Sequence, residues 1–134
     1  MFQTLNGGQP GPFVIGRAPW DVVRHLGASN NRVLLYPSTG PKLLAKHNID
    51  LVYYNQLPLA LRYGWMGKDK DKHLCFIFNE PFLFDRKLKV VLKTDHTRTE
   101  IILVTMHKIA DRDEARHKKR CAKIRDHLKI EEGP

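Results

Sequence analysis

Three runs of strand-forming residues in the second half of the chain place the strongest limit on its fold. They cover residues 74–78, 88–93 and 100–109, and they are rich in branched and aromatic side chains. Polar connections separate the runs, so the strands are expected to pair as an antiparallel meander. The last run is apolar on both faces at its centre, which predicts that this strand lies in the interior of the sheet.

The first half of the chain reads instead as short helices with turn residues between them. The expected helices cover residues 20–26, 42–47 and 56–63. Residues 32–36 predict a short strand, whereas residues 49–54 suit either a strand or a helix. Residues 1–16 are rich in glycine and proline, so they predict an extended or flexible lead-in.

A basic helix over residues 110–129 is expected to close the chain. Acidic residues occupy its first turn and basic residues dominate the remainder, which suits the helix dipole. A narrow apolar stripe on it can dock on the sheet, and its members are His117, Cys121, Ile124 and Leu128. A cationic ridge on another face consists of Arg112, Arg116, Lys119 and Lys123. The 134 residues thus predict one α+β domain with N-terminal helices, an antiparallel β-meander of three to four strands and a C-terminal basic helix.

The chain carries a large positive charge that is concentrated in its second half. Lysine and arginine number 23 against 14 acidic residues, a formal net charge of +9, and 14 of the 23 lie from Arg86 onward. A run of charges on one helix is most often only a solvated surface. A positive excess over the whole chain, however, attracts phosphate polymers, and neutralising several phosphates at once gives tight, salt-sensitive binding. Nucleic acid is therefore the expected partner.

Several other classes of function find little support in the sequence. No apolar run approaches the roughly 20 residues that cross a bilayer, and no secretory signal is recognisable. We therefore expect no membrane contact and a cytoplasmic site of action. The seven histidines lack the close spacing of a metal site, so neither a metal nor any other cofactor is expected. Cys75 and Cys121 are expected to be reduced thiols.

The residue types that remain suit metal-independent cleavage of RNA. In that reaction the 2′-hydroxyl attacks the neighbouring phosphate, so an enzyme need supply only a base, an acid and positive charge for the phosphorane. Such groups cluster at a hairpin connection and on the strand after it: Lys93, His96, Arg98, Thr105, His107 and Lys108. Any one of them alone is better explained as an ordinary turn or strand residue. Their clustering is what favours the functional interpretation.

Three segments follow one another in an order that is found in a known protein family. They are Leu43-Leu44-Ala45-Lys46-His47 at a helix end, Leu57-Pro58-Leu59-Ala60-Leu61, and Ile101-Ile102-Leu103-Val104-Thr105-Met106-His107-Lys108 in the final strand. Over residues 43–108 the chain resembles the barnase/EndoU/colicin/RelE-like (BECR) superfamily of toxin ribonucleases, especially its phage-associated branch. The resemblance implies N-terminal helices with a four-stranded antiparallel sheet, and cleavage of RNA, often tRNA or mRNA, without a metal.

The resemblance also implies an active site made of His47, Lys93 and Thr105, with His107 beside them. His47 or His107 would exchange protons, Lys93 would stabilise the phosphorane, and Thr105 would position a phosphate oxygen. The expected activity is that of a toxin-type endoribonuclease that leaves a 2′,3′-cyclic phosphate, with an acidic immunity or antitoxin protein as the partner that covers the basic cleft.

The basic residues expected to hold the RNA are Lys89, His96, Arg98, Lys108, Arg112, Arg116, Lys119 and Lys123. Two alternatives from other classes stay open. One is a nucleic-acid-binding module without catalysis, and the other is a basic adaptor that binds an acidic protein.

Overall fold

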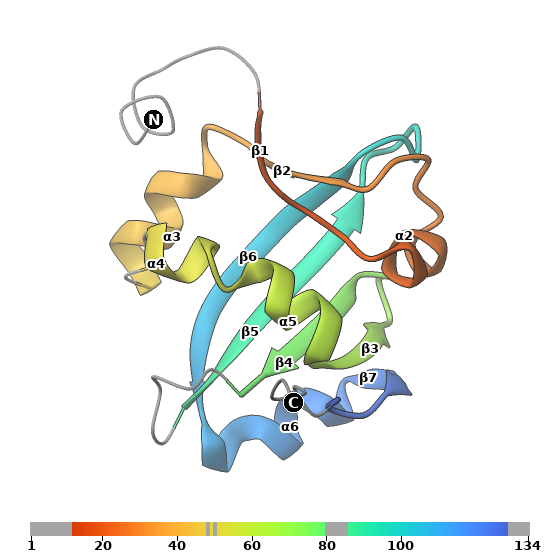
Figure 1. Ribbon diagram of the computed structural model, residues 1–134. Coiled ribbons are helices and arrows are strands. Elements are labelled where there is room, and N and C mark those ends of the chain that lie inside the picture. The colour runs from red at the N-terminus through yellow and green to blue at the C-terminus, as the bar shows by residue number, and fades with distance from the viewer. Residues whose placement is uncertain (1–11, 48, 50, 80–85, 129–134) are drawn as a thin grey trace, which may run out of the picture.

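In the part of the chain that the computed structural model describes, residues 12–47, 49, 51–79 and 86–128, seven strands form one mixed β-sheet (Figure 1). Their order across the sheet is β1-β2-β6-β5-β4-β3-β7. The strands are β1 (Phe13–Arg17), β2 (Arg32–Leu35), β3 (Trp65–Asp69), β4 (Leu74–Phe78), β5 (Arg86–Thr94), β6 (Ile101–Ala110) and β7 (Cys121–Arg125). The helices are α2 (Trp20–Leu26), α3 (Thr39–His47), α4 (Leu51–Tyr54), α5 (Leu57–Tyr63) and α6 (Glu114–Lys119), and a 3-10 turn, η1, covers Asp111–Asp113.

The antiparallel meander predicted for the second half is confirmed. Strands β3, β4, β5 and β6 pair in chain order, each antiparallel to the one before. On its other side β6 runs parallel to β2, with Val33 opposite Ile101. The beginning of β6 therefore has neighbours on both sides, as its two apolar faces predict. The α+β class is confirmed as well, and helix α2 has the predicted bounds.

The predicted number of three to four strands is wrong, because the described residues form seven. The additional strands are β1, β3 and β7. Strand β1 begins within the predicted lead-in, of which residues 1–11 lie outside the described residues. Strand β3 ends in a charged stretch, residues 68–72, that reads as a solvated loop. Strands β1 and β7 are the two edges of the sheet, where pairing with a neighbour outweighs the local hydrophobic pattern.

The predicted long basic helix is also wrong. The chain is helical only over η1 and α6, and after Arg120 it forms β7 along the edge of β3. Pairing satisfies the backbone groups of that edge, whereas a docked helix would bury only a narrow stripe that ends in Leu128, which is 49% exposed here. The predicted stripe is therefore divided between α6, β7 and the residues after β7, and the predicted cationic ridge between η1, α6 and β7.

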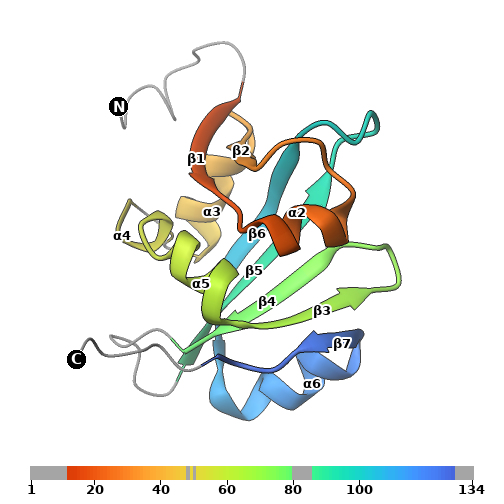
Figure 2. The ribbon, with the colours of Figure 1, turned by 45° about the vertical axis from the view of Figure 1, so that its right-hand side comes forward.

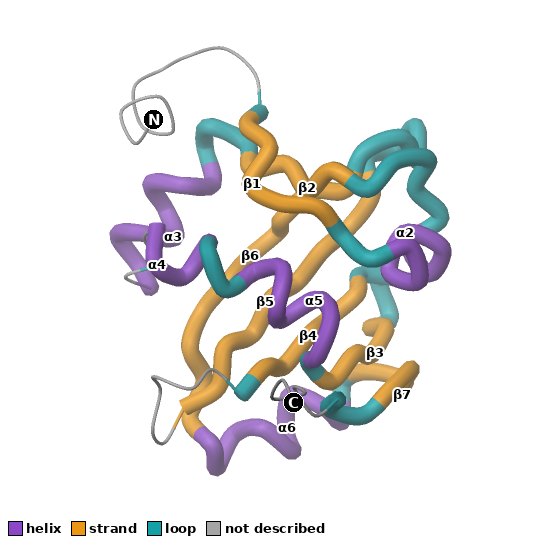
Figure 3. Tube along the Cα trace, viewed as in Figure 1, coloured by secondary structure: helices purple, strands orange, loops and turns teal. Residues whose placement is uncertain are grey.

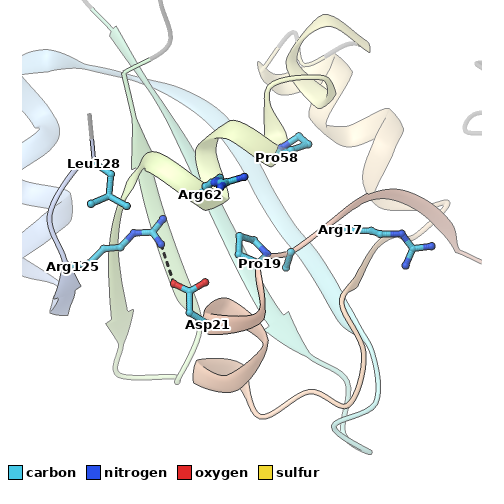
Figure 4. A pocket seen from close by; sticks show the side chains of 8 residues that line it. Arg17, Pro19, Asp21, Pro58, Arg62, Arg125 and Leu128 are labelled. Atoms are coloured by element: carbon cyan, nitrogen blue, oxygen red, sulfur yellow. Dashed lines mark hydrogen bonds and ion pairs between the residues drawn. The ribbon is translucent and has the colours of Figure 1, made fainter. Parts of the chain in front are cut away.

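A guanidinium group holds β7 in place. Arg125 donates hydrogen bonds to the carbonyl oxygens of Leu61, at 2.6 Å, and Gly64, at 3.1 Å, and it pairs with the Asp21 carboxylate at 3.2 Å. A pocket of about 470 Å³ surrounds this ion pair between α2, α5 and the end of β7 (Figure 4). Because internal partners already satisfy the Arg125 side chain, we assign this residue to the fold.

The sheet has two unlike faces. Helices α2, α3 and α5 cover one face and enclose the main hydrophobic core, as Figures 2 and 3 show. In β5 the side chains of Leu88, Val90 and Leu92 enter this core, so Lys87, Lys89, Val91 and Lys93 alternate onto the opposite face. That second face carries a smaller apolar cluster of Trp65, Ile77 and Ile109, with Cys121 packed against it.

A bulge in β6 decides which of its side chains reach the second face. The pairing of β5 with β6 passes from Val91 opposite Thr105 to Leu92 opposite Leu103, which leaves Val104 without a partner. Leu103 and Met106 are consequently both in the main core, and Thr105 and His107 lie on the opposite face. Among the described helices, none is long and apolar enough to cross a membrane.

Candidate functional site

Three histidines from separate elements lie close together, with His107 of β6 at the centre. The His47 ring, at the end of α3, stacks on the His107 ring with centroids 4.9 Å apart and an angle of 28° between the ring planes. The His117 ring, from α6, lies 6.4 Å from the His107 ring and is tilted by 59°. Helix α3 packs along β6, and α6 follows β6 after η1, so the fold itself brings these positions together.

Lys89 and Thr105 complete the cluster. Lys89 is directly opposite His107 in the pairing of β5 with β6, and its Nζ lies 2.9 Å from His117 Nδ1. An ammonium group can only donate, so His117 Nδ1 accepts this hydrogen bond and a neutral His117 ring carries its proton on Nε2. Thr105 Oγ1 lies 3.4 Å from His107 Nδ1. Lys89 thus lies opposite His107 in the sheet and is hydrogen-bonded to the His117 ring from α6.

The surroundings keep the central histidine neutral at physiological pH. Burial lowers the pKa of His107 from 6.5 to about 4, and the proximity of His47, Lys89 and His117 acts in the same direction. Burial also lowers the pKa of His117, together with Lys89, Arg116 and Arg120, while Asp113 opposes them. A neutral imidazole can accept a proton, and the arrival of a phosphate would relieve the repulsion among these positive charges.

A pocket of about 420 Å³ opens beside Lys89 and His117. Its basic lining residues are Lys70, Lys89, His117 and Arg120, and its acidic ones are Asp69 and Asp71. Such a volume is within the range of pockets that hold small molecules. A phosphate or a nucleotide base that enters it would come directly against the Lys89 ammonium and the His117 ring.

The two cysteines line the same pocket as free thiols. Burial raises the pKa of Cys75 to about 12, and the neighbouring Cys121 thiol and Asp69 carboxylate add to this effect, against the Lys89 ammonium. Cys75 is therefore protonated at neutral pH, which makes it a poor nucleophile. Over the described residues, no group of three or more histidine, cysteine or acidic side chains is arranged to hold a metal ion.

Of the four predicted catalytic residues, the structure brings His47, Thr105 and His107 together. Lys93 is not with them, because it lies four residues beyond Lys89 on β5, about 13 Å along the strand. It lines a different pocket. Lys89, predicted only as an RNA contact, has the position beside His107. The position of His117 could not be read from the sequence, where it belongs to the predicted apolar stripe.

The other predicted RNA contacts are spread over several surfaces. Lys108 Nζ lies 5.0 Å from the centre of the Tyr53 ring, and Arg98 lines the same pocket as Lys93. Arg116 pairs with Asp113 at 3.3 Å, and Lys123 pairs with Asp126 at 3.2 Å. His96, Arg112 and Lys119 are exposed. These residues do not make one continuous ridge.

Comparisons of this chain with models of protein families, with curated proteins and with solved structures found no match. Its function is therefore inferred from the geometry of its own side chains.

Proposed function

We propose that this protein is a metal-independent endoribonuclease that cleaves RNA by acid-base chemistry. The observation that carries the proposal is the position of Lys89, which is hydrogen-bonded to His117 and pairs across the sheet with His107, two histidines with lowered pKa values. Two imidazoles can take and give the protons of an internal transphosphorylation, and the Lys89 ammonium can stabilise the phosphorane.

The spacing of the rings supports distinct roles for the three histidines. Stacked rings with centroids 4.9 Å apart leave no room for a phosphate between them, so His47 supports the His107 ring from one side. The rings of His107 and His117 are farther apart and tilted, and a phosphate would approach them through the pocket that Lys89 and His117 line. Thr105, hydrogen-bonded to His107 Nδ1, orients that ring.

The proposed reaction is an internal transphosphorylation. His107 accepts the proton of the 2′-hydroxyl, the O2′–P bond forms, and the P–O5′ bond breaks. His117 gives a proton to the departing 5′-oxygen, and the products are a 2′,3′-cyclic phosphate and a free 5′-hydroxyl. An incoming phosphate competes for Lys89, which releases Nδ1 of His117 and favours its protonation before the reaction.

The wider biological proposal follows from the family resemblance. We propose that the protein is a toxin-type ribonuclease of the BECR superfamily that acts on tRNA or mRNA in the cytoplasm. An acidic immunity or antitoxin protein would then cover the basic surface. The net charge of +9 and the histidine cluster support this proposal.

A direct test is to incubate the purified protein with total RNA in the presence of a chelator. Loss of discrete RNA species supports the ribonuclease. If the same RNA species stay intact with a Lys89→Ala variant, the activity depends on the histidine cluster. Lys42→Ala is a matched control, because it removes the same charge from the exposed surface of α3. Intact RNA that is retarded on a gel would instead support a binding module without catalysis.

A further inference from the structure

A second basic pocket, of about 450 Å³, is lined by residues of the β3–β4 turn, the β5–β6 turn and the end of α2. Figure 1 shows these three segments on the same side of the molecule. Its lining includes five lysine and arginine side chains but a single carboxylate, that of Asp71. The five cations are Arg24, Lys68, Lys72, Lys93 and Arg98. Lys93 and Arg98 were predicted to cluster at the hairpin connection, whereas Arg24, Lys68 and Lys72 were not predicted to join them.

These cations gather without acidic partners. Among the residues that the structure describes, none of the five is within ion-pair distance of a carboxylate. The Lys68 ammonium instead donates a hydrogen bond to the carbonyl oxygen of His25, at 2.9 Å, at the end of α2. Like charges that converge in a concave surface repel one another, and a bound anion would relieve that repulsion.

The backbone of the pocket is unusual in the same place. Within the described residues, three have a positive φ: Gly27 at 74°, Lys72 at 65° and Arg98 at 57°. All three line this pocket. Glycine adopts this conformation without strain, but lysine and arginine do not. Strained positions that coincide with a pocket are a reason to look for a ligand there.

The two turns that carry the strained cations are built alike. One runs from Asp69 to Lys72 and the other from Asp95 to Arg98. In each, the amide of the fourth residue donates to the carbonyl oxygen of the aspartate, at 3.0 Å. The aspartate Oδ1 also accepts the amide of the residue after the turn, at 2.9 Å in the first turn and 2.8 Å in the second. Each aspartate thus fixes its turn, and the fourth position presents a cation.

We propose that this pocket binds a phosphate group of an RNA strand whose cleaved phosphodiester lies at His107. The inference rests on the proposed function for the identity of the ligand. Lys89 and Lys93 lie on one face of β5, about 13 Å apart along the strand, and they connect the histidine cluster with the pocket. The pocket holds the strand at a distance of a few nucleotides from the bond that is cut.

Two glycine variants, Lys72→Gly and Arg98→Gly, test the pocket without endangering the fold. Each removes one cation and also relieves the positive φ, so the melting temperature should stay equal or rise. The probe is a 2′-O-methyl RNA of about 12 nucleotides, which cannot be cleaved. Each variant should bind it several-fold more weakly, and the slope of log affinity against log salt concentration should fall by about one.

Lys42→Ala again serves as the charge-matched control, and it should bind like the wild type. Glycine variants with the affinity of this control would overturn the proposal. A second arm titrates inorganic phosphate alone. If the pocket binds inorganic phosphate as tightly as it binds the oligonucleotide, the ligand is a free anion and the RNA strand is ruled out. The probe is not cleaved, so these binding results do not depend on whether the wild-type protein cuts RNA. The proposed function fails on a different result, the absence of RNA cleavage by the wild-type protein.

Discussion

The ring of His47 at the end of α3 stacks on the ring of His107 in β6, with their centroids 4.9 Å apart. Lys89 faces His107 from the neighbouring strand, so a positive charge lies beside the central imidazole. Burial and the neighbouring groups together keep His107 neutral well below the ordinary titration range of histidine. The site is thus arranged to accept a proton and to gain stability when an anion binds.

The lowered pKa of His107 predicts how stability depends on pH. The unfolded chain binds a proton here near pH 6.5 and the folded chain only near pH 4, so the free energy of unfolding should fall as the pH drops from 6.5 to 4. Because His107 is only partly buried, we expect a contribution on the order of 1–2 kcal/mol after allowance for solvent screening. Urea denaturation of the wild type and of His107→Gln at several pH values measures it. The variant should lose this part of the pH dependence, and identical curves would contradict the assignment.

The hydrogen bond between Lys89 and His117 predicts a second pKa change. The Lys89 charge lowers the pKa of His117 and its ammonium occupies Nδ1, so Lys89→Ala should raise the pKa of His117. NMR titration of the His117 ring measures this shift, and Lys42→Ala provides the control with an unchanged value. A His117 pKa that does not respond to Lys89→Ala would show that the two groups are not in contact in solution.

The anchoring of β7 predicts a large effect at its last residue. Arg125→Ala removes two hydrogen bonds to backbone carbonyl oxygens and the ion pair with Asp21. We expect a loss of about 2–3 kcal/mol in the free energy of unfolding, since the half-buried carbonyl groups lose their donors. Lys123→Ala on the same strand breaks only an exposed pair with Asp126, so it should cost less than about 1 kcal/mol. Equal losses in urea denaturation would contradict the anchoring role.

The parts of the fold that the sequence predicts are those with a strong local pattern. Strands β4, β5 and β6 are rich in aliphatic and aromatic residues, and Gly27 ends α2 in the left-handed conformation. Edge strand β7 has no such pattern. Its apolar residues, Cys121 and Ile124, have the spacing of a helix face. The segment becomes a strand because it pairs with the edge of β3.

The candidate site depends on the register in which β5 pairs with β6, and the sequence pattern does not predict this register. Lys89 and Lys93 both occupy the same face of β5, and only the pairing with β6 puts Lys89 rather than Lys93 opposite His107. His117 reaches the site because η1 and α6 turn the chain back after β6. No local sequence pattern predicts that Lys89 lies opposite His107 or that His117 reaches the site. The predicted residues His47, Thr105 and His107 do lie together.

The most direct test of the proposed chemistry is the rate at which the protein forms 2′,3′-cyclic phosphate ends on a short RNA in chelator. The wild type and Lys42→Ala should cleave at the same rate, while His107→Ala and His117→Ala should be about 100- to 10,000-fold slower and still folded. Cleavage by either histidine variant at the rate of Lys42→Ala, or no cyclic phosphate from the wild type on any RNA, would contradict the account.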